Sequence, residues 1–288
     1  MQDHRYDYLV STAWLADHID APDVVVVDGS WHLPTTERRA ATEYREAHIP
    51  GAVFLDIDEV ADHTSDLPHM LPAPAAFASA VRRLGIGDGQ TIVVYDSVGF
   101  YSAPRVWWMF RAMGAPRVFV LDGGLPRWLA EGRPVEDGIV RRPARHFTAR
   151  LDHAMVATKD DVLAALKSGE AVVVDARSSG RFAGTAPEPR KGIRSGHMPG
   201  AYNLPYTNLI GPDGSLRSVD ALYTAFADAG VDLDKPVITT CGSGVSAAVL
   251  NLALRSLGHT SIAIYDGAWA EWGRDPNLPV AGNGEGNS

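Results

Sequence analysis

The chain contains two copies of one sequence pattern, and this duplication limits the folds open to it. Four blocks occur twice in the same order, roughly 145 residues apart. The pairs are VVVVDGSW and AVVVDARS, AHIPGAVFLD and GHMPGAYNLP, GQTIVVYDSVGFYSA and KPVITTCGSGVSA, and VFVLDGGLPRWLAEGRPV and IAIYDGAWAEWGRDPNLPV. Repeats of this length are too long for a solenoid, so each half, about 130 residues, is expected to fold as a domain with its own core.

Each half alternates short apolar runs with helical stretches. Runs rich in β-branched residues are too short for helices and suit buried parallel strands. They span residues 24–27, 91–95, 117–121, 171–174, 237–240 and 261–265. Helices are predicted over residues 74–84, 102–113, 221–229 and 246–257. Gly114 and Gly258 follow two of these helices, where a left-handed C-terminal stop is expected. The predicted fold class is α/β, with two tandem domains that each hold an open parallel sheet flanked by helices.

The repeat also predicts the domain limits. We expect an N-terminal domain over residues 1–134 and a C-terminal domain over residues 156–288. Between them, residues 135–155 carry Arg and Pro with no clear period and are predicted to be a linker. The linker is long, so we expect it to cross the back of both domains.

Composition and charge exclude several functions. Hydrophobic residues make up 45% and charged residues 21%, as in an ordinary folded protein. The net charge of −9 gives phosphate backbones no overall attraction, so nucleic acid is not expected as a partner. No run approaches the ~18 apolar residues of a membrane helix, and the opening MQDHRYDYLV lacks the order of a signal peptide. We therefore expect no membrane partner and a cytoplasmic location.

The chain has one cysteine, Cys241, which excludes an intrachain disulfide and a multi-cysteine metal site. The predicted strand PVITT leads directly into Cys241-Gly242-Ser243-Gly244-Val245-Ser246 and then into a helix. Successive backbone N–H groups of such a turn converge on its centre, and the helix adds its positive N-terminal end. We expect this environment to favour the thiolate, the nucleophilic form of cysteine. The alternative is that a lone cysteine is a small buried apolar residue. The glycines and the position at the carboxyl end of a parallel strand favour a ligand site.

These features resemble the two-domain rhodanese-type sulfurtransferases, from about residue 8 to residue 280. In that family the C-terminal domain holds the reactive cysteine and the N-terminal domain is a degenerate copy. Here Asp96 stands in the N-terminal half at the position of Cys241. The loop CGSGVSA is most similar to that of the 3-mercaptopyruvate sulfurtransferases, whereas thiosulfate-specific members carry two basic residues after the cysteine. The resemblance implies that sulfur moves from 3-mercaptopyruvate, through a persulfide on Cys241, to an acceptor, with release of pyruvate.

The residues of the loop also bear on the donor. Thiosulfate is a dianion, which basic side chains beside the sulfur would hold through charge-assisted hydrogen bonds. Gly242 and Ser243 cannot do this. Breaking the carbon–sulfur bond of mercaptopyruvate leaves an enolate that must gain a proton, and the Ser243 hydroxyl suits that step. A serine in a Gly-rich turn is also a common turn former. Gly244, Val245 and Ser246 complete the loop and are expected to contact the substrate.

Substrate anchors are expected among the arginines of residues 177–197, RSSGRFAGTAPEPRKGIRSGH, a cationic stretch in an acidic chain. A run of charges is more often a solvated face. The segment GRFAGTAPEPR, however, resembles the substrate-binding segment of the mercaptopyruvate enzymes. The resemblance implies that Arg181 and Arg190 hold the carboxylate and the ketone oxygen, and the planar guanidinium suits this role because it binds a carboxylate through two hydrogen bonds.

The N-terminal half is expected to contribute from across the cleft. FLDIDEVADHTSDLPHMLP contains Asp58 and His69, and the resemblance implies that these join Ser243 in an Asp-His-Ser relay. GFYSAPRVWWMFRAMG matches the family as well. Tyr101 is expected to line the pocket, and the aromatic residues that follow it are expected in a helix core.

Two repeated residue pairs are predicted to be structural. His48 and His197 occupy equivalent places, each followed by a Pro-Gly turn. Because the N-terminal half lacks the cysteine yet keeps its histidine, both are expected to bond a backbone group. Asp122 and Asp266, each before Gly at a strand end, receive the same interpretation.

Alternatives stay open at this point. A thiosulfate:cyanide sulfurtransferase would share the fold. A Cys-dependent phosphatase or arsenate reductase would carry an Arg six residues after the cysteine, where this chain has Ala247. A non-catalytic scaffold would have no need of Cys241 and its glycines. For the favoured interpretation, the sulfur acceptor is a thiol, reduced thioredoxin or cyanide, and no metal or organic cofactor is needed.

Overall fold

Two parallel sheets, one in each half, organise the chain. The structure is a computed structural model and describes residues 3–282. The N-terminal sheet has the order β1-β5-β4-β2-β3, and the C-terminal sheet has the order β6-β10-β9-β7-β8. The strands pair in parallel throughout, and the two orders correspond strand for strand. The predicted duplication is therefore confirmed as two copies of one α/β topology.

The elements of the two halves follow one another in the same sequence. The N-terminal half contains η1 (Arg5–Asp7), β1 (Leu9–Val10), α1 (Thr12–His18), β2 (Val24–Asp28), α2 (Ala40–Glu46), β3 (Val53–Phe54), α3 (Pro74–Arg83), β4 (Thr91–Tyr95), α4 (Ala103–Ala112), β5 (Val118–Leu121) and α5 (Gly124–Ala130). The C-terminal half contains η2 (His153–Met155), β6 (Val156–Ala157), α6 (Lys159–Ser168), β7 (Val172–Asp175), α7 (Ser179–Ala183), β8 (Tyr202–Asn203), η3 (Tyr206–Leu209), α8 (Val219–Asp228), β9 (Val237–Thr240), α9 (Ala247–Ser256), β10 (Ile262–Tyr265) and α10 (Ala268–Trp272). Within residues 3–282, no helix combines the length and the apolar character that a membrane crossing requires.

The central strands β2, β4, β7 and β9 are buried at every position, because helices cover both faces of each sheet. This is why their sequences are continuous apolar runs that can be located in advance. Gly114 and Gly258 follow α4 and α9 with φ of 87° and 84°, as predicted for left-handed helix ends. The two-residue strands β1, β3, β6 and β8 escape sequence prediction because two residues leave no periodic signal.

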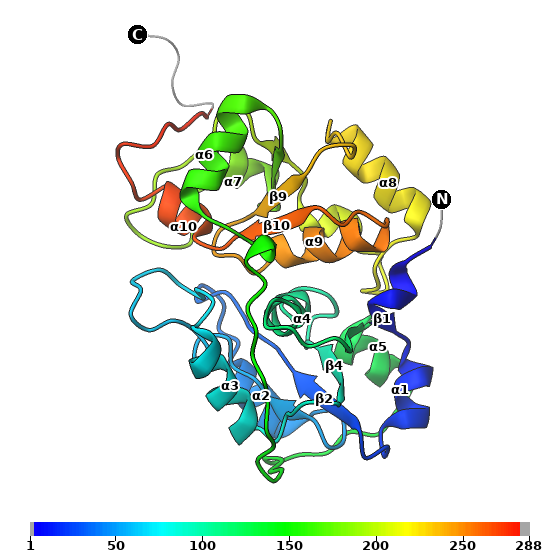
Figure 1. The fold of residues 1–288 in the computed structure, drawn as a ribbon. Coiled ribbons are helices and arrows are strands. Elements are labelled where there is room, and N and C mark those ends of the chain that lie inside the picture. The colour runs from blue at the N-terminus through cyan, green and yellow to red at the C-terminus, as the bar shows by residue number, and fades with distance from the viewer. Residues whose placement is uncertain (1–2, 283–288) are drawn as a thin grey trace.

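The two halves meet along α4 and α9, which lie against each other between the sheets (Figure 1). Both helices are buried over almost their whole length, including Trp107 and Trp108 of α4. Each helix follows one of the two matched loops, that of Asp96 or that of Cys241. The helix pair therefore brings the N-terminal half up to the Cys241 loop.

Two aspartates tie the halves together in a reciprocal way. The Oδ1 atom of Asp122, in the N-terminal half, accepts a hydrogen bond from the N–H of Leu216 at 2.9 Å. The Oδ2 atom of Asp266, in the C-terminal half, accepts one from the N–H of Leu71 at 2.6 Å. Both contacts hold a backbone segment of the opposite half, so the prediction that this pair is structural is confirmed.

The repeated histidines are structural as well. His48 Nδ1 bonds the carbonyl of Tyr44 at 2.7 Å, and His197 Nδ1 bonds the carbonyl of Phe182 at 2.8 Å. Each imidazole also stacks on the ring of the residue whose carbonyl it contacts. The predicted backbone bond of both histidines is therefore confirmed.

Residues 135–155 run along the N-terminal half (Figure 1). Phe147 packs edge-on against Phe77 and Phe110 in the core, and the N–H of Arg150 donates to the carbonyl of Met113 at 2.9 Å. At the end of the segment, η2 contacts β6 and β10 of the C-terminal sheet. Outside the segment, the backbone bonds of residues 136–152 go to the N-terminal half, where Phe147 fills part of the core.

Candidate active site around Cys241

Cys241 begins the loop between β9 and α9. Its carbonyl accepts the N–H of Trp269 at 2.9 Å, and the next carbonyl, of Gly242, accepts the N–H of Ala270 at 3.0 Å. Gly244 has a φ of 78°, a conformation that favours glycine and turns the chain toward α9. The Cys241 side chain is only 2% exposed. Its surroundings therefore cover almost the whole residue.

The matched loop of the N-terminal half shows what kind of chemical group a loop of this shape binds. Asp96 takes the place of the cysteine and is fully buried. Its carboxylate accepts four backbone N–H groups, at 2.7 to 3.0 Å, from Val98, Tyr101, Ser102 and Ala103. The N-terminal loop is thus an anion cradle filled by the chain's own carboxylate. Because Cys241 stands at the same position before α9, we expect a thiolate or persulfide there to face the equivalent N–H groups.

Arg181, on α7, lies over the Cys241 loop. Its Nη2 atom is 2.7 Å from the position that a Cβ atom on Gly242 would take, so a side chain at residue 242 would displace the guanidinium. Glu188 holds this guanidinium, with 2.5 Å between Nη2 and Oε2 and 3.3 Å between Nε and Oε1. Arg181 is therefore beside the cysteine loop, with part of its charge balanced by Glu188.

Asp58, His69 and Arg190 form a chain of contacts that crosses from the N-terminal to the C-terminal half. His69 Nδ1 lies 3.0 Å from Asp58 Oδ1, and Arg190 Nη2 lies 3.1 Å from His69 Nε2. An arginine can only donate, so Nε2 is the acceptor and the ring proton is on Nδ1, toward Asp58. Trp31 Nε1 donates to the other carboxylate oxygen of Asp58 at 2.8 Å.

The ionisable groups around Cys241 affect one another's pKa values. Burial lowers the pKa of His69 below its ordinary value, although Asp58 opposes the shift, so the imidazole is neutral at pH 7. Burial also lowers the pKa of Arg190, and the nearby charges of Cys241 and Asp58 oppose that shift. Burial raises the pKa of Tyr101, and the charge of Cys241 adds to the increase. These mutual effects indicate that Cys241, Arg190 and Tyr101 share one electrostatic environment.

Ser243 lies buried in the loop. In the part of the chain that the structure describes, no hydrogen bond joins Ser243 to His69, whose Nε2 atom contacts Arg190 instead. Of the expected relay, the structure therefore shows the Asp58–His69 contact but no hydrogen bond from His69 to Ser243. The side chain of Val245 is buried in the apolar core, so the expected contact of this residue with a substrate would be made by its backbone.

A cavity of about 400 Å³ opens beside the loop and is lined from both halves. Arg181, Tyr206 and Ser246 line it from the C-terminal half, and Tyr101 and Arg38 line it from the N-terminal half. The rings of Tyr101 and Tyr206 lie 5.3 Å apart. The cavity is large enough for a small organic acid, and both Tyr101 and Ser246 line it.

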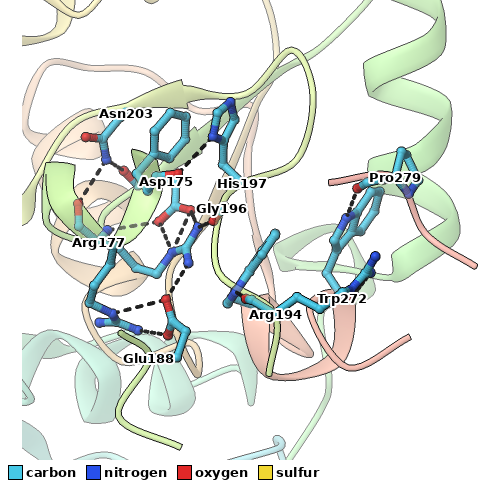
Figure 2. A network of polar contacts seen from close by, with 12 residues as sticks. Asp175, Arg177, Glu188, Arg194, Gly196, His197, Asn203, Trp272 and Pro279 are labelled. Carbon is cyan, nitrogen blue, oxygen red and sulfur yellow. Dashed lines mark hydrogen bonds and ion pairs between the residues drawn. The ribbon is translucent and has the colours of Figure 1, made fainter. Parts of the chain in front are cut away.

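Two other arginines of the cationic stretch, Arg177 and Arg194, are held by protein groups (Figure 2), although Arg177 also contributes to the lining of the cavity. Arg177 is 2% exposed and is bound by the carboxylates of Asp175 and Glu188, both at 2.7 Å. Arg194 donates to backbone carbonyls near the C-terminal end, among them those of Trp272 and Leu278. Neither residue is among the two anchors, Arg181 and Arg190, that the resemblance implies. Glu188 connects the structural Arg177 with Arg181 at the loop.

Three residues at the site carry no clear signal in the sequence. Trp31 fixes Asp58, Glu188 fixes Arg181, and Arg105 of α4 donates to the backbone carbonyl of His69. Each of the three contacts a residue from another segment of the chain, and the contact exists only once the chain has folded. The matched block GFYSAPRV contains Arg105, and its charge within an otherwise apolar helix start is the one sequence feature that could have marked it.

Comparison with known proteins agrees with this fold. The sequence model of the rhodanese-like domain matches residues 11–131 and again residues 158–275. The chain therefore belongs to the rhodanese family, with two rhodanese-like domains, as the sequence resemblance predicted.

Among its relatives, the 3-mercaptopyruvate sulfurtransferase of Escherichia coli (strain K12) is 45% identical over 95% of this chain and 97% of that protein. The thiosulfate sulfurtransferase of Cricetulus griseus is 44% identical over 93% of this chain and 92% of that protein. The crystal structure of SseA from Escherichia coli, described as a 3-mercaptopyruvate sulfurtransferase, matches with a TM-score of 0.85 and 44% identity, over 91% of this chain and 98% of that one.

Proposed function

We propose that this protein transfers the sulfur of 3-mercaptopyruvate to an acceptor through a persulfide on Cys241, and releases pyruvate. The observation that carries the proposal is the pairing of two arginines, Arg181 and Arg190, with a cysteine loop that itself bears no charge. A monoanionic keto acid needs one guanidinium for its carboxylate and a second donor for its ketone oxygen. The relatives named as 3-mercaptopyruvate sulfurtransferases support the same donor.

In the first step the Cys241 thiolate attacks the donor sulfur. A sulfur–sulfur bond forms, the carbon–sulfur bond breaks, and its electron pair goes to the pyruvate enolate. The proton of the donor thiol leaves the sulfur and is returned to the enolate carbon, so that Cys241 keeps the persulfide anion and pyruvate is the product. The N–H groups at the start of α9 stabilise that anion, as their counterparts stabilise the carboxylate of Asp96.

His69 is suited to carry this proton. Its neutral imidazole has the Nε2 lone pair available once a donor displaces Arg190, and Asp58 next to Nδ1 stabilises the imidazolium that forms. Ser243 is the hydroxyl through which the proton reaches the enolate. Because His69 Nε2 is bonded to Arg190 and not to Ser243 in the structure, this step requires a Ser243–His69 hydrogen bond to form when the donor binds.

The second step passes the outer sulfur to an acceptor. A thiol, reduced thioredoxin or cyanide would attack the persulfide and regenerate the Cys241 thiolate. The Tyr101–Tyr206 cavity is the route open to such an acceptor. The cytoplasmic location, the identity of the acceptor and the lack of a required metal or organic cofactor stay predictions from the sequence.

A second candidate function is transfer from thiosulfate to cyanide, which the similarity to a thiosulfate sulfurtransferase favours. The uncharged loop opposes it, because Gly242 and Ser243 offer no cation to a second negative charge of the donor. The measurement that decides between the two is kcat/KM for each donor with the same acceptor. A higher value for thiosulfate would show that the argument from loop charge is wrong.

The persulfide itself is tested by mass spectrometry without an acceptor. The protein is mixed with 3-mercaptopyruvate, desalted and weighed, and we expect a gain of one sulfur atom together with one equivalent of pyruvate. Cys241→Ser is the control and should show neither product. An unmodified wild-type protein, or the same gain in the Ser variant, would refute a persulfide on Cys241.

A further inference from the structure

Arg105 is a buried cation that the proposed reaction does not use. It is the third residue of α4 and is fully buried at the junction of the two halves. Its guanidinium lies over the ring of Trp108, 4.5 Å from the ring centre. Nη1 is 2.9 Å from the place that a Cβ atom on Gly244 would take, so the guanidinium packs directly against the cysteine loop.

We propose that Arg105, held by Asp266, is a positioning residue that fixes the backbone of His69 beside the Cys241 loop for proton transfer. This inference rests on the proposed function. Arg105 Nη1 pairs with Asp266 Oδ1 at 2.7 Å, and Nη2 donates to the backbone carbonyl of His69. The same aspartate accepts the N–H of Leu71 on its other oxygen at 2.6 Å. One ion pair therefore holds the segment from His69 to Leu71 at two backbone points.

The segment needs such an anchor because of its backbone conformation. His69 has a φ of 60°, in the left-handed region that residues with a side chain enter rarely. That conformation aims the imidazole at Asp58 on one side and Arg190 on the other. Without the bond to its carbonyl, His69 is free to relax toward ordinary backbone angles, which would turn the ring away from both partners.

The repeat supplies an internal comparison. In the N-terminal half, Asp122 binds the N–H of Leu216 as Asp266 binds that of Leu71. The third residue of α9, in the place of Arg105, is the apolar Val249. Asp122 has an arginine of its own half nearby, with 4.0 Å between Arg127 Nη1 and Asp122 Oδ2. The arginine at Asp266 differs, because Arg105 comes from the opposite half, is fully buried and also donates to the backbone carbonyl of His69 in the segment that Asp266 holds.

Arg105→Lys is the first test, because it keeps the buried charge and loses the fork that reaches Asp266 and His69 together. The rate of persulfide formation is measured in a single turnover with 3-mercaptopyruvate and with thiosulfate. Thiosulfate gives up its outer sulfur and leaves as sulfite with no proton to be delivered. We expect the rate with mercaptopyruvate to fall at least tenfold while the rate with thiosulfate stays within twofold. Equal losses with both donors, or no loss with either, would overturn the inference.

Asp266→Asn and Asp122→Asn form a matched pair of variants. Each weakens one aspartate tie between the halves, and we expect the larger decrease in the urea midpoint for Asp266→Asn, because it also leaves the buried Arg105 without its ion-pair partner. Only Asp266→Asn should slow the reaction with mercaptopyruvate relative to thiosulfate. Equal donor effects in the two variants would show that the tie acts on stability alone.

A wild-type protein that forms no persulfide from mercaptopyruvate would defeat the proposed function. A wild-type protein that forms it, with Arg105→Lys variants of unchanged rate, would defeat only the positioning role. The two failures are therefore distinguishable in the same experiment.

Discussion

Replacing Asp96 removes the anion from the loop that mirrors the cysteine loop. The wild-type carboxylate accepts four N–H groups, three of them on Oδ2 and one on Oδ1. Asp96→Ala leaves all four without a partner. Asp96→Asn can keep the three bonds to Oδ2 if its amide oxygen takes that position, and it then loses only the bond to Val98. The two variants therefore should differ in a graded way.

The expected losses follow from the cost of a buried N–H without an acceptor, about 1–3 kcal/mol each. Four such groups would cost roughly 4–12 kcal/mol, but the desolvation of the buried carboxylate, several kcal/mol, is recovered when it is removed. We expect Asp96→Ala to lower the free energy of unfolding by about 3–6 kcal/mol. Asp96→Asn should lower it by about 1–3 kcal/mol.

The assay is urea unfolding followed by tryptophan fluorescence, with hydrogen exchange of the peptide that contains residues 96–103. Exchange of these amides should accelerate about tenfold for each 1.4 kcal/mol lost. If Asp96→Ala unfolds within about 1 kcal/mol of the wild type and its loop amides stay protected, the carboxylate does not hold the cradle together. The expectation that the Cys241 loop stabilises an anion would then lose its structural support.

Three further predictions concern charge and pH. Glu188→Gln removes a negative charge beside Arg181, so kcat/KM for dianionic thiosulfate should rise about tenfold relative to kcat/KM for mercaptopyruvate. As the control, Glu136→Gln changes a half-exposed carboxylate of the linker and should leave this ratio unchanged. Burial lowers the pKa of His69, so protonation on acidification should reduce kcat/KM for mercaptopyruvate below pH 6.5, and His69→Gln should lack this limb of the profile. Burial raises the pKa of Asp28 from 3.8 to about 6, so the folded state binds this proton more tightly than the unfolded state. The free energy of unfolding should therefore decrease by about 3 kcal/mol as the pH rises from 4 to 6. Urea titrations should show that Asp28→Asn lacks this decrease and is more stable than the wild type at pH 7.5; an unchanged decrease would refute the assignment.

The sequence predicts the fold well because its strongest signals are local. Buried parallel strands are short apolar runs, and the repeat supplies a second example of each. The Cys241 loop is recognisable for the same reason, since its glycines, its cysteine and the following helix are contiguous. The helix ends at Gly114 and Gly258 are also local events.

The contacts among distant segments could not be predicted from the chain alone. Arg190 and His69 lie 121 residues apart in sequence, and their contact depends on how the two halves pack. Glu188 is no different in sequence from a solvated carboxylate until the loop folds back onto Arg177 and Arg181. Arg105 stands out as a charge within an otherwise apolar helix, but the sequence does not show that Asp266 and His69 are its partners. Spacing in the sequence says nothing about whether Ser243 bonds to His69, and in the described residues His69 Nε2 bonds to Arg190 instead.

The reciprocal ties of Asp122 and Asp266 give the junction between the halves an approximate two-fold symmetry. This is the self-complementary geometry by which two identical subunits associate. In a true homodimer, any substitution falls on both subunits at once, so a carboxylate that occupies one cradle occupies the other as well. Joining the copies in one polypeptide removes that constraint. One copy can then lose its nucleophile and serve only to line the cavity beside the other copy's cysteine loop.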